Sequence, residues 1–140
     1  MNKRLFVDDL RFPTTNHAYM SDELRKPFYE GEWELVRHYD DFVKWIETNG
    51  LPEYLSLDHD CEYICVVDNP KLVNDNEIII NQQCRFDKEA KNGLDCAKWL
   101  VDYCTKRNID LPKYQCHSQN HYGKRDILEL LDNYKKQIYR

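Results

Sequence analysis

The chain has 140 residues, of which 41% are hydrophobic and 32% are charged, and its formal net charge is −5. This length suits a single domain with a core of its own, and the composition excludes a disordered chain. The acidic balance argues against duplex DNA or a membrane surface as a partner, because proteins that bind them usually carry a basic face. No apolar stretch is long enough to cross a membrane.

The N-terminus and the cysteines bear on the cellular compartment. Asp8 and Asp9 end the first apolar run after three residues, too soon for the hydrophobic region of a signal sequence. We therefore expect a cytoplasmic protein whose six cysteines are reduced thiols. A zinc site is a weaker alternative, because Cys116, His117 and His121 lie close together but no paired Cys-x-x-Cys motif accompanies them.

The first predicted element is a short buried strand at residues 4–7, which runs into the acidic pair Asp8 and Asp9. Residues 10–31 contain two prolines and a glycine without a clean hydrophobic period. We expect a long loop there, with one helical turn near residues 21–24. Loops of this length in compact domains tend to be functional.

Residues 33–38 alternate like a second strand, and a helix follows whose N-cap we assign to Asp40 or Asp41. A third short strand is predicted at residues 54–57, and it also ends in acids. The residues that follow this strand are Asp58, His59 and Asp60.

Two β-rich segments, at 63–67 and 77–80, predict a β-hairpin inserted at about 61–90. The pair Asn92-Gly93 then precedes a helix with one apolar face. A further strand at 114–116 ends in polar residues, and a last helix begins at about Lys124. Without the insertion, strands alternate with helices, which predicts an α/β fold around a parallel sheet.

Three of the predicted strands end in polar residues, and the carboxyl ends of parallel strands share one edge of a sheet. We therefore expect Asp8, Asp9 and Asp58 to meet. Adjacent buried carboxylates repel one another, and a hard divalent cation relieves that repulsion. Because Mg²⁺ prefers oxygen ligands, these acids predict a site for Mg²⁺ or Mn²⁺ that can polarise a phosphoryl oxygen. Asp58 would then belong to both the metal site and the catalytic centre.

Nearby polar residues suit a phosphate. Arg11 can hold a phosphate through its planar fork. Ser118 and Asn120 precede the last helix, whose N-terminal N–H groups attract anions. His59 or His117 can transfer a proton near neutral pH. The expected ligand is a small phosphorylated molecule or a nucleotide.

Structural roles remain open for the same residues. Acids at strand ends often form turns or cap helices, a lone histidine in a loop is often solvated, and Arg11 can be a surface ion pair. Ser118 lacks the Gly-x-Ser-x-Gly setting of a hydrolase nucleophile. With only four glycines, the chain has no P-loop and no dinucleotide-binding fingerprint.

Four segments together carry a resemblance to a known family: 6–13 (FVDDLRFP), 55–60 (LSLDHD), 92–100 (NGLDCAKWL) and 117–123 (HSQNHYG). On these residues the chain resembles the cyclic-phosphate-processing receiver-like domains of bacteria and phages. Those domains are similar to response-regulator receivers in fold. The resemblance spans residues 4–134 apart from the insertion.

The resemblance implies a flavodoxin-like three-layer sandwich over residues 1–140, with a four-stranded parallel sheet of order 2-1-3-4. It implies that Asp8, Asp9 and Asp58 match the receiver acid pocket, and that Ser118 matches the receiver hydroxyl position on the fourth strand. No fifth strand is predicted, so the lysine that receivers place there has no counterpart. This departure argues against phosphoryl relay from a histidine kinase.

Two functions from different classes follow. The first is a metal-dependent phosphoesterase that processes a small nucleotide or a terminal cyclic phosphate. The second is a non-catalytic module that binds a nucleotide signal or a partner protein in a phage or bacterial setting. A phospho-receiver with Asp58 as the acceptor is a third alternative. Nothing in the sequence assigns an oligomeric state.

Overall fold

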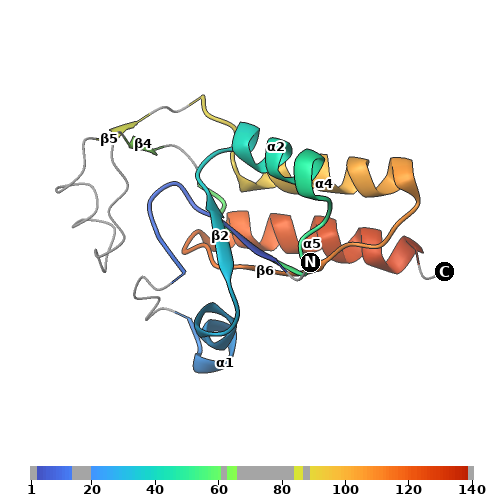
Figure 1. Ribbon diagram of the computed structural model, residues 1–140, viewed down its shortest axis with the longest axis horizontal. Coiled ribbons are helices and arrows are strands. Elements are labelled where there is room, and N and C mark those ends of the chain that lie inside the picture. The colour runs from blue at the N-terminus through green and yellow to red at the C-terminus, as the bar shows by residue number, and fades with distance from the viewer. Residues whose placement is uncertain (1–2, 14–19, 61–62, 66–83, 87–88, 139–140) are drawn as a thin grey trace.

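A computed structural model describes residues 3–13, 20–60, 63–65, 84–86 and 89–138. Its centre is a parallel sheet of four strands in the order β2-β1-β3-β6 (Figure 1). The strands are β1 (Arg4–Val7), β2 (Trp33–Val36), β3 (Tyr54–Leu57) and β6 (Lys113–Cys116). The α/β class and the strand order 2-1-3-4 are therefore confirmed, and the described part of the chain adds no fifth strand to this sheet.

Helices cover the two faces of the sheet unequally. The long helices α2 (Tyr39–Asn49), α4 (Gly93–Arg107) and α5 (His121–Ile138) pack on one face, and the short α1 (Asp22–Arg25) lies on the other side (Figure 1). The 3-10 helix η1 (Lys26–Tyr29) continues α1 and supplies a buried phenylalanine to that second face. The domain is thus a three-layer sandwich with one thick and one thin outer layer.

The period of two along each strand assigns side chains to these faces. Leu5 and Val7 of β1 belong to the large core under α2, α4 and α5, whereas Phe6 belongs to the smaller cluster with Phe28 of η1. Asp8 follows Phe6 by two residues and continues its face. The same alternation in β3 sends Leu55 and Leu57 to the large core, and the polar residues between and after them face η1.

Local signals explain most helix ends. Ser21 caps α1, since its hydroxyl accepts a hydrogen bond from the Leu24 N–H at 3.3 Å. The predicted cap of α2 at Asp40 or Asp41 is wrong: the helix begins at Tyr39, and His38 is the N-cap. Both acids instead lie in the first turn, where negative charge favours the helix dipole.

The two last helices each begin directly after an asparagine. Asn92 and Asp95 form a reciprocal capping box at the start of α4. Helix α5 begins at His121, three residues before the predicted start at Lys124. The earlier start follows from Asn120, whose side-chain oxygen accepts a hydrogen bond from the Gly123 N–H at 2.9 Å.

The predicted insertion contains a pair of antiparallel strands. Strands β4 (Tyr63–Cys65) and β5 (Cys84–Phe86) pair antiparallel and form a separate two-stranded sheet. The second strand therefore lies at 84–86, and the predicted strand at 77–80 falls outside the described residues.

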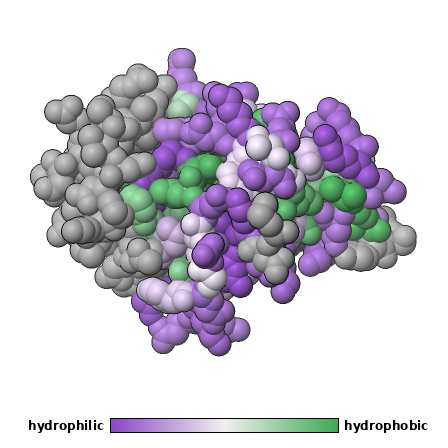
Figure 2. Space-filling model, viewed as in Figure 1, coloured by the Kyte–Doolittle hydropathy of each residue, from purple (hydrophilic) through white to green (hydrophobic). Residues whose placement is uncertain are grey.

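Three cysteines in the described part of the chain are buried and free, as expected for reduced thiols. Burial raises the pKa of Cys96 and Cys116 to about 12 and that of Cys104 to about 11, so these thiols stay protonated at neutral pH. The described residues on the face seen in Figure 2 are mostly hydrophilic, with smaller hydrophobic patches. Among the described helices, none is both long and apolar enough to span a membrane.

Gly93 allows α4 to start directly against the end of β3. A Cβ atom at this position would lie 1.8 Å from the backbone oxygen of Asp58, which no side-chain rotation can relieve. We expect Gly93→Ala to lower the free energy of unfolding by about 2 kcal/mol, the usual scale for a forced overlap in a packed region. Urea denaturation measures this, with the exposed Lys98→Ala on the same helix as the control. Equal stability of the two variants would contradict the packing argument.

Candidate functional site

A pocket of about 140 Å³ opens at the carboxyl edge of the sheet. The segments that follow β1, β3 and β6 all contribute to it, so the three polar strand ends meet as the topology requires. The residues that line it are Asp8, Asp9, Leu10, Arg11, Asp58, Asp60, Ser118, Gln119 and Asn120.

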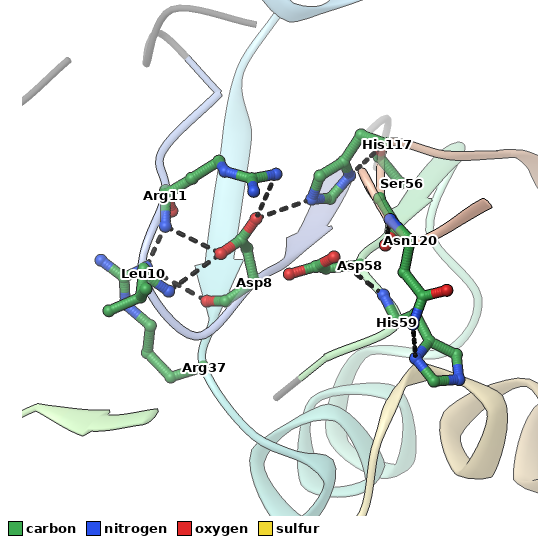
Figure 3. A network of polar contacts seen from close by, with 10 residues as sticks. Asp8, Leu10, Arg11, Arg37, Ser56, Asp58, His59, His117 and Asn120 are labelled. Carbon is green, nitrogen blue, oxygen red and sulfur yellow. Dashed lines mark hydrogen bonds and ion pairs between the residues drawn. The ribbon is translucent and has the colours of Figure 1, made fainter. Parts of the chain in front are cut away.

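Asp8 is 1% exposed and is held on both carboxylate oxygens (Figure 3). Oδ1 accepts hydrogen bonds from the backbone N–H groups of Leu10 at 2.9 Å and Arg11 at 2.8 Å. Oδ2 lies 2.9 Å from Nε2 of His117. Burial alone would raise the pKa of Asp8, but the bond from His117 and the charge of Arg11 outweigh it and hold the pKa well below its usual range. Asp8 is therefore ionised.

His117 is fully buried in the thin layer of the fold. Its ring stacks on Phe6 with 4.3 Å between centroids and meets the edge of Phe28. Burial lowers the pKa of His117 below 6.5, so the ring is neutral at neutral pH and carries one proton. A carboxylate only accepts, which puts this proton on Nε2; Nδ1 then accepts from the Ser56 hydroxyl at 2.7 Å. Both ring nitrogens are occupied.

Asp58 differs from Asp8 in its partners. It is 5% exposed, and the hydrogen bond that the structure gives its Oδ1 comes from the His59 backbone N–H at 2.9 Å. Burial raises the pKa of Asp58 well above 3.8, and the neighbouring Asp8 adds to the rise. One oxygen of Asp8, one of Asp58 and a ring nitrogen of His117 all lie within 4.8 Å of one another.

Asp9 and Asp60 complete the acidic lining. Asp9 is buried, whereas Asp60 is half exposed and pairs through Oδ1 with Nδ1 of His59 at 2.7 Å. The His59 ring points away from Asp58 (Figure 3) and packs on Gly123. The structure thus places Asp8, Asp9 and Asp58 around one pocket and leaves the His59 ring outside its lining.

The three residues predicted to hold phosphate all line the pocket. The Arg11 side chain is buried, with Nη1 3.8 Å from Oδ2 of Asp8. The Ser118 hydroxyl accepts a hydrogen bond from the Asn120 N–H at 3.0 Å. Asn120 uses its side-chain oxygen to cap α5. Asn120 therefore both lines the pocket and caps the helix that follows it.

Two residues that organise the site were not predicted. Arg37 donates through Nη1 to the backbone oxygens of Asp8 and Arg11, at 3.1 and 2.7 Å, and lies over the Phe12 ring. Nothing in its sequence context distinguishes it from a surface arginine. Ser56 did carry a signal, because it is a lone hydroxyl between leucines in a buried strand.

The strand order and the acidic pocket together define a receiver-like α/β domain. The family model of the cyclic-phosphate processing receiver domain matches residues 3–133, and the chain belongs to this family. The domain is thus tied to cyclic-phosphate processing, as the resemblance implied. Comparison with curated proteins gave no significant match, and comparison with solved structures gave none either.

The raised pKa of Asp58 makes a prediction about stability. Because the folded state holds this proton more tightly than the unfolded state, the carboxyl favours folding at low pH, and this contribution is lost as the pH rises from 3.8 through the folded pKa. We expect Asp58→Asn, without added metal, to be more stable than the original chain by about 1 kcal/mol at pH 8, as when a strained functional charge is removed. Denaturant titrations from pH 5 to 8 measure the difference. A variant that is less stable throughout this range would refute the account of Asp58.

Proposed function

We propose that the chain is a metal-dependent phosphoesterase that opens the cyclic phosphate of a small nucleotide or a terminal cyclic phosphate. One observation carries the proposal: Asp8 and Asp58 are buried in one pocket with further acids beside them. Among the described residues that line this pocket, Arg11 is the only cationic one. A divalent cation supplies the charge that this arrangement lacks.

The donor set fits Mg²⁺ or Mn²⁺, because carboxylate oxygens are the ligands that both ions prefer. Asp8 has already accepted three hydrogen bonds, so one of its four lone pairs is left for an ion. Asp58 has more capacity, and Asp9 lines the same pocket. We assign the ion to Asp9 and Asp58, with Asp8 as the third ligand. When bound, the ion polarises a phosphoryl oxygen.

Arg11 and Ser118 suit the phosphate itself. Arg11 brings the positive charge of a planar donor group into the pocket lining. Ser118 brings a hydroxyl from the end of β6, next to the positive N-terminal end of the 18-residue helix α5. Hydrolysis forms a bond between water oxygen and phosphorus and breaks one ester bond. The alkoxide that leaves phosphorus takes up the proton that the water loses, and the product is a phosphate monoester.

The acids lead to a direct test of turnover. We expect Asp9→Asn and Asp58→Asn each to lower Mg²⁺-dependent opening of a nucleoside 2′,3′-cyclic phosphate by at least about 100-fold, the scale of losing one essential electrostatic group. ³¹P NMR resolves the cyclic diester from the monoester. Asp102→Asn, on the exposed side of α4, is the matched control and should keep full activity. Undiminished turnover in both pocket variants would end the enzymatic proposal.

The state of the two histidines supports a second candidate, a module that binds cyclic phosphates without turnover. His117 has both nitrogens engaged, and the His59 ring points away from Asp58 and pairs with Asp60. The predicted proton carriers therefore do not face the pocket in this conformation. Calorimetric binding of a cyclic nucleotide in the presence of Mg²⁺, with an unchanged ³¹P spectrum over hours, would favour this second function.

Both candidates share one pH dependence. A proton on Asp58 competes with the cation, because burial raises the pKa of this carboxyl. The dissociation constant for Mg²⁺ should therefore rise as the pH falls, by up to about tenfold per unit below the pKa of Asp58. Calorimetry at pH 6, 7 and 8 in buffers of different ionisation enthalpy detects the released proton. An affinity independent of pH, with no proton release, would place the ion elsewhere.

A further inference from the structure

Three buried polar side chains form a continuous chain behind the pocket (Figure 3). The Ser56 hydroxyl lies 2.7 Å from Nδ1 of His117, and Nε2 of His117 lies 2.9 Å from Oδ2 of Asp8. Each residue is at most 1% exposed. Ser56 lies in β3, His117 follows β6 and Asp8 follows β1, and the His117 ring contacts Phe28 of η1.

The strand order explains why these three residues are needed to link His117 to Asp8. His117 follows β6 and Asp8 follows β1, and β3 lies between those strands. Since adjacent strands are about 4.8 Å apart, the imidazole must reach across β3 to meet Asp8. The residue of β3 beneath that crossing must be small, and it must offer a hydrogen bond to the ring. Ser56 meets both requirements.

Each hydrogen bond between Ser56, His117 and Asp8 has a defined donor and acceptor. The carboxylate of Asp8 accepts from Nε2–H of His117, and this leaves Nδ1 as an acceptor for the Ser56 hydroxyl. Phe6 fixes the tilt of the ring, with an interplanar angle of 9°. The backbone N–H groups of Leu10 and Arg11 hold the other carboxylate oxygen. The carboxylate plane of Asp8 is therefore fixed by hydrogen bonds to both of its oxygens.

We infer that Ser56 is a positioning residue for the cation site, acting on Asp8 through His117. Ser56 does not line the pocket, so its effect on an ion can only be transmitted. Groups that orient a metal ligand in this way typically change metal affinity by 10- to 100-fold. The inference rests on the proposed function in one respect, namely that the ion binds at Asp8, Asp9 and Asp58.

The test replaces the hydroxyl alone. Ser56→Ala keeps the small size that the crossing requires, and we expect it to weaken Mn²⁺ binding by about tenfold, measured by electron paramagnetic resonance of the free ion. Tyr134→Phe is the matched control, because it also removes a buried hydroxyl, one that donates to the Ile109 oxygen remote from the pocket lining. It should lose stability and keep full Mn²⁺ affinity.

A ring spectrum separates positioning from a general loss of stability. In the original chain, ¹⁵N NMR should show His117 protonated on Nε2, with a hydrogen-bonded Nδ1; His117→Gln identifies the signals. In Ser56→Ala the Nδ1 signal should move towards that of a free lone pair, and in Tyr134→Phe it should not move. Unchanged Mn²⁺ affinity in Ser56→Ala would overturn the inference and leave the proposed function standing. No Mn²⁺ binding by the original chain would overturn both.

Discussion

Asp8 and Asp58 are two buried carboxyl groups at one edge of one sheet, and the electrostatic cost of that arrangement constrains the rest of the site. Asp8 stays ionised because donors surround it, namely two backbone N–H groups, the His117 ring and the nearby Arg11. Asp58 receives one backbone N–H and faces the charge of Asp8. Two identical groups on neighbouring strands therefore have pKa values displaced in opposite directions.

The fold produces this asymmetry through simple geometry. Strand alternation sends Asp8 and Asp58 to the thin side of the sandwich, where η1 and the loop after β1 are the cover. Arg37 ties that loop to the sheet through the backbone oxygens of Asp8 and Arg11. His117 follows β6, which lies two strands from β1, and its side chain reaches across β3 to Asp8. Among the described contacts, its ring makes no hydrogen bond to Asp58.

The sequence was sufficient for the sheet and for the location of the pocket. Short apolar runs that end in acids predicted strands whose carboxyl ends share an edge. The alternation of strands and helices predicted that the sheet is parallel, and the family resemblance implied its strand order. The sequence did not predict the hydrogen-bond and packing partners of individual side chains. A histidine after a strand looks the same whether it is solvated or buried, so the stacking of His117 on Phe6 had no sequence signal. Two helix starts also differ from the prediction: α2 begins after His38, which makes no side-chain cap bond, whereas α5 begins after Asn120, whose side chain caps it.

The electrostatic cost of burying the Asp58 carboxylate beside Asp8 argues for a ligand. A domain that needed only to fold would be more stable without a desolvated carboxyl beside another negative charge. The backbone of Asp58 is also closely packed, because Gly93 leaves no room there for a Cβ atom. Asp8, by contrast, already accepts three hydrogen bonds without any ion. The electrostatic cost of the pocket is thus concentrated at Asp58, and Arg11 lies in the same lining. A divalent cation at Asp58 would offset this cost, and a phosphate bound to that cation would bring its negative charge into the pocket that Arg11 lines.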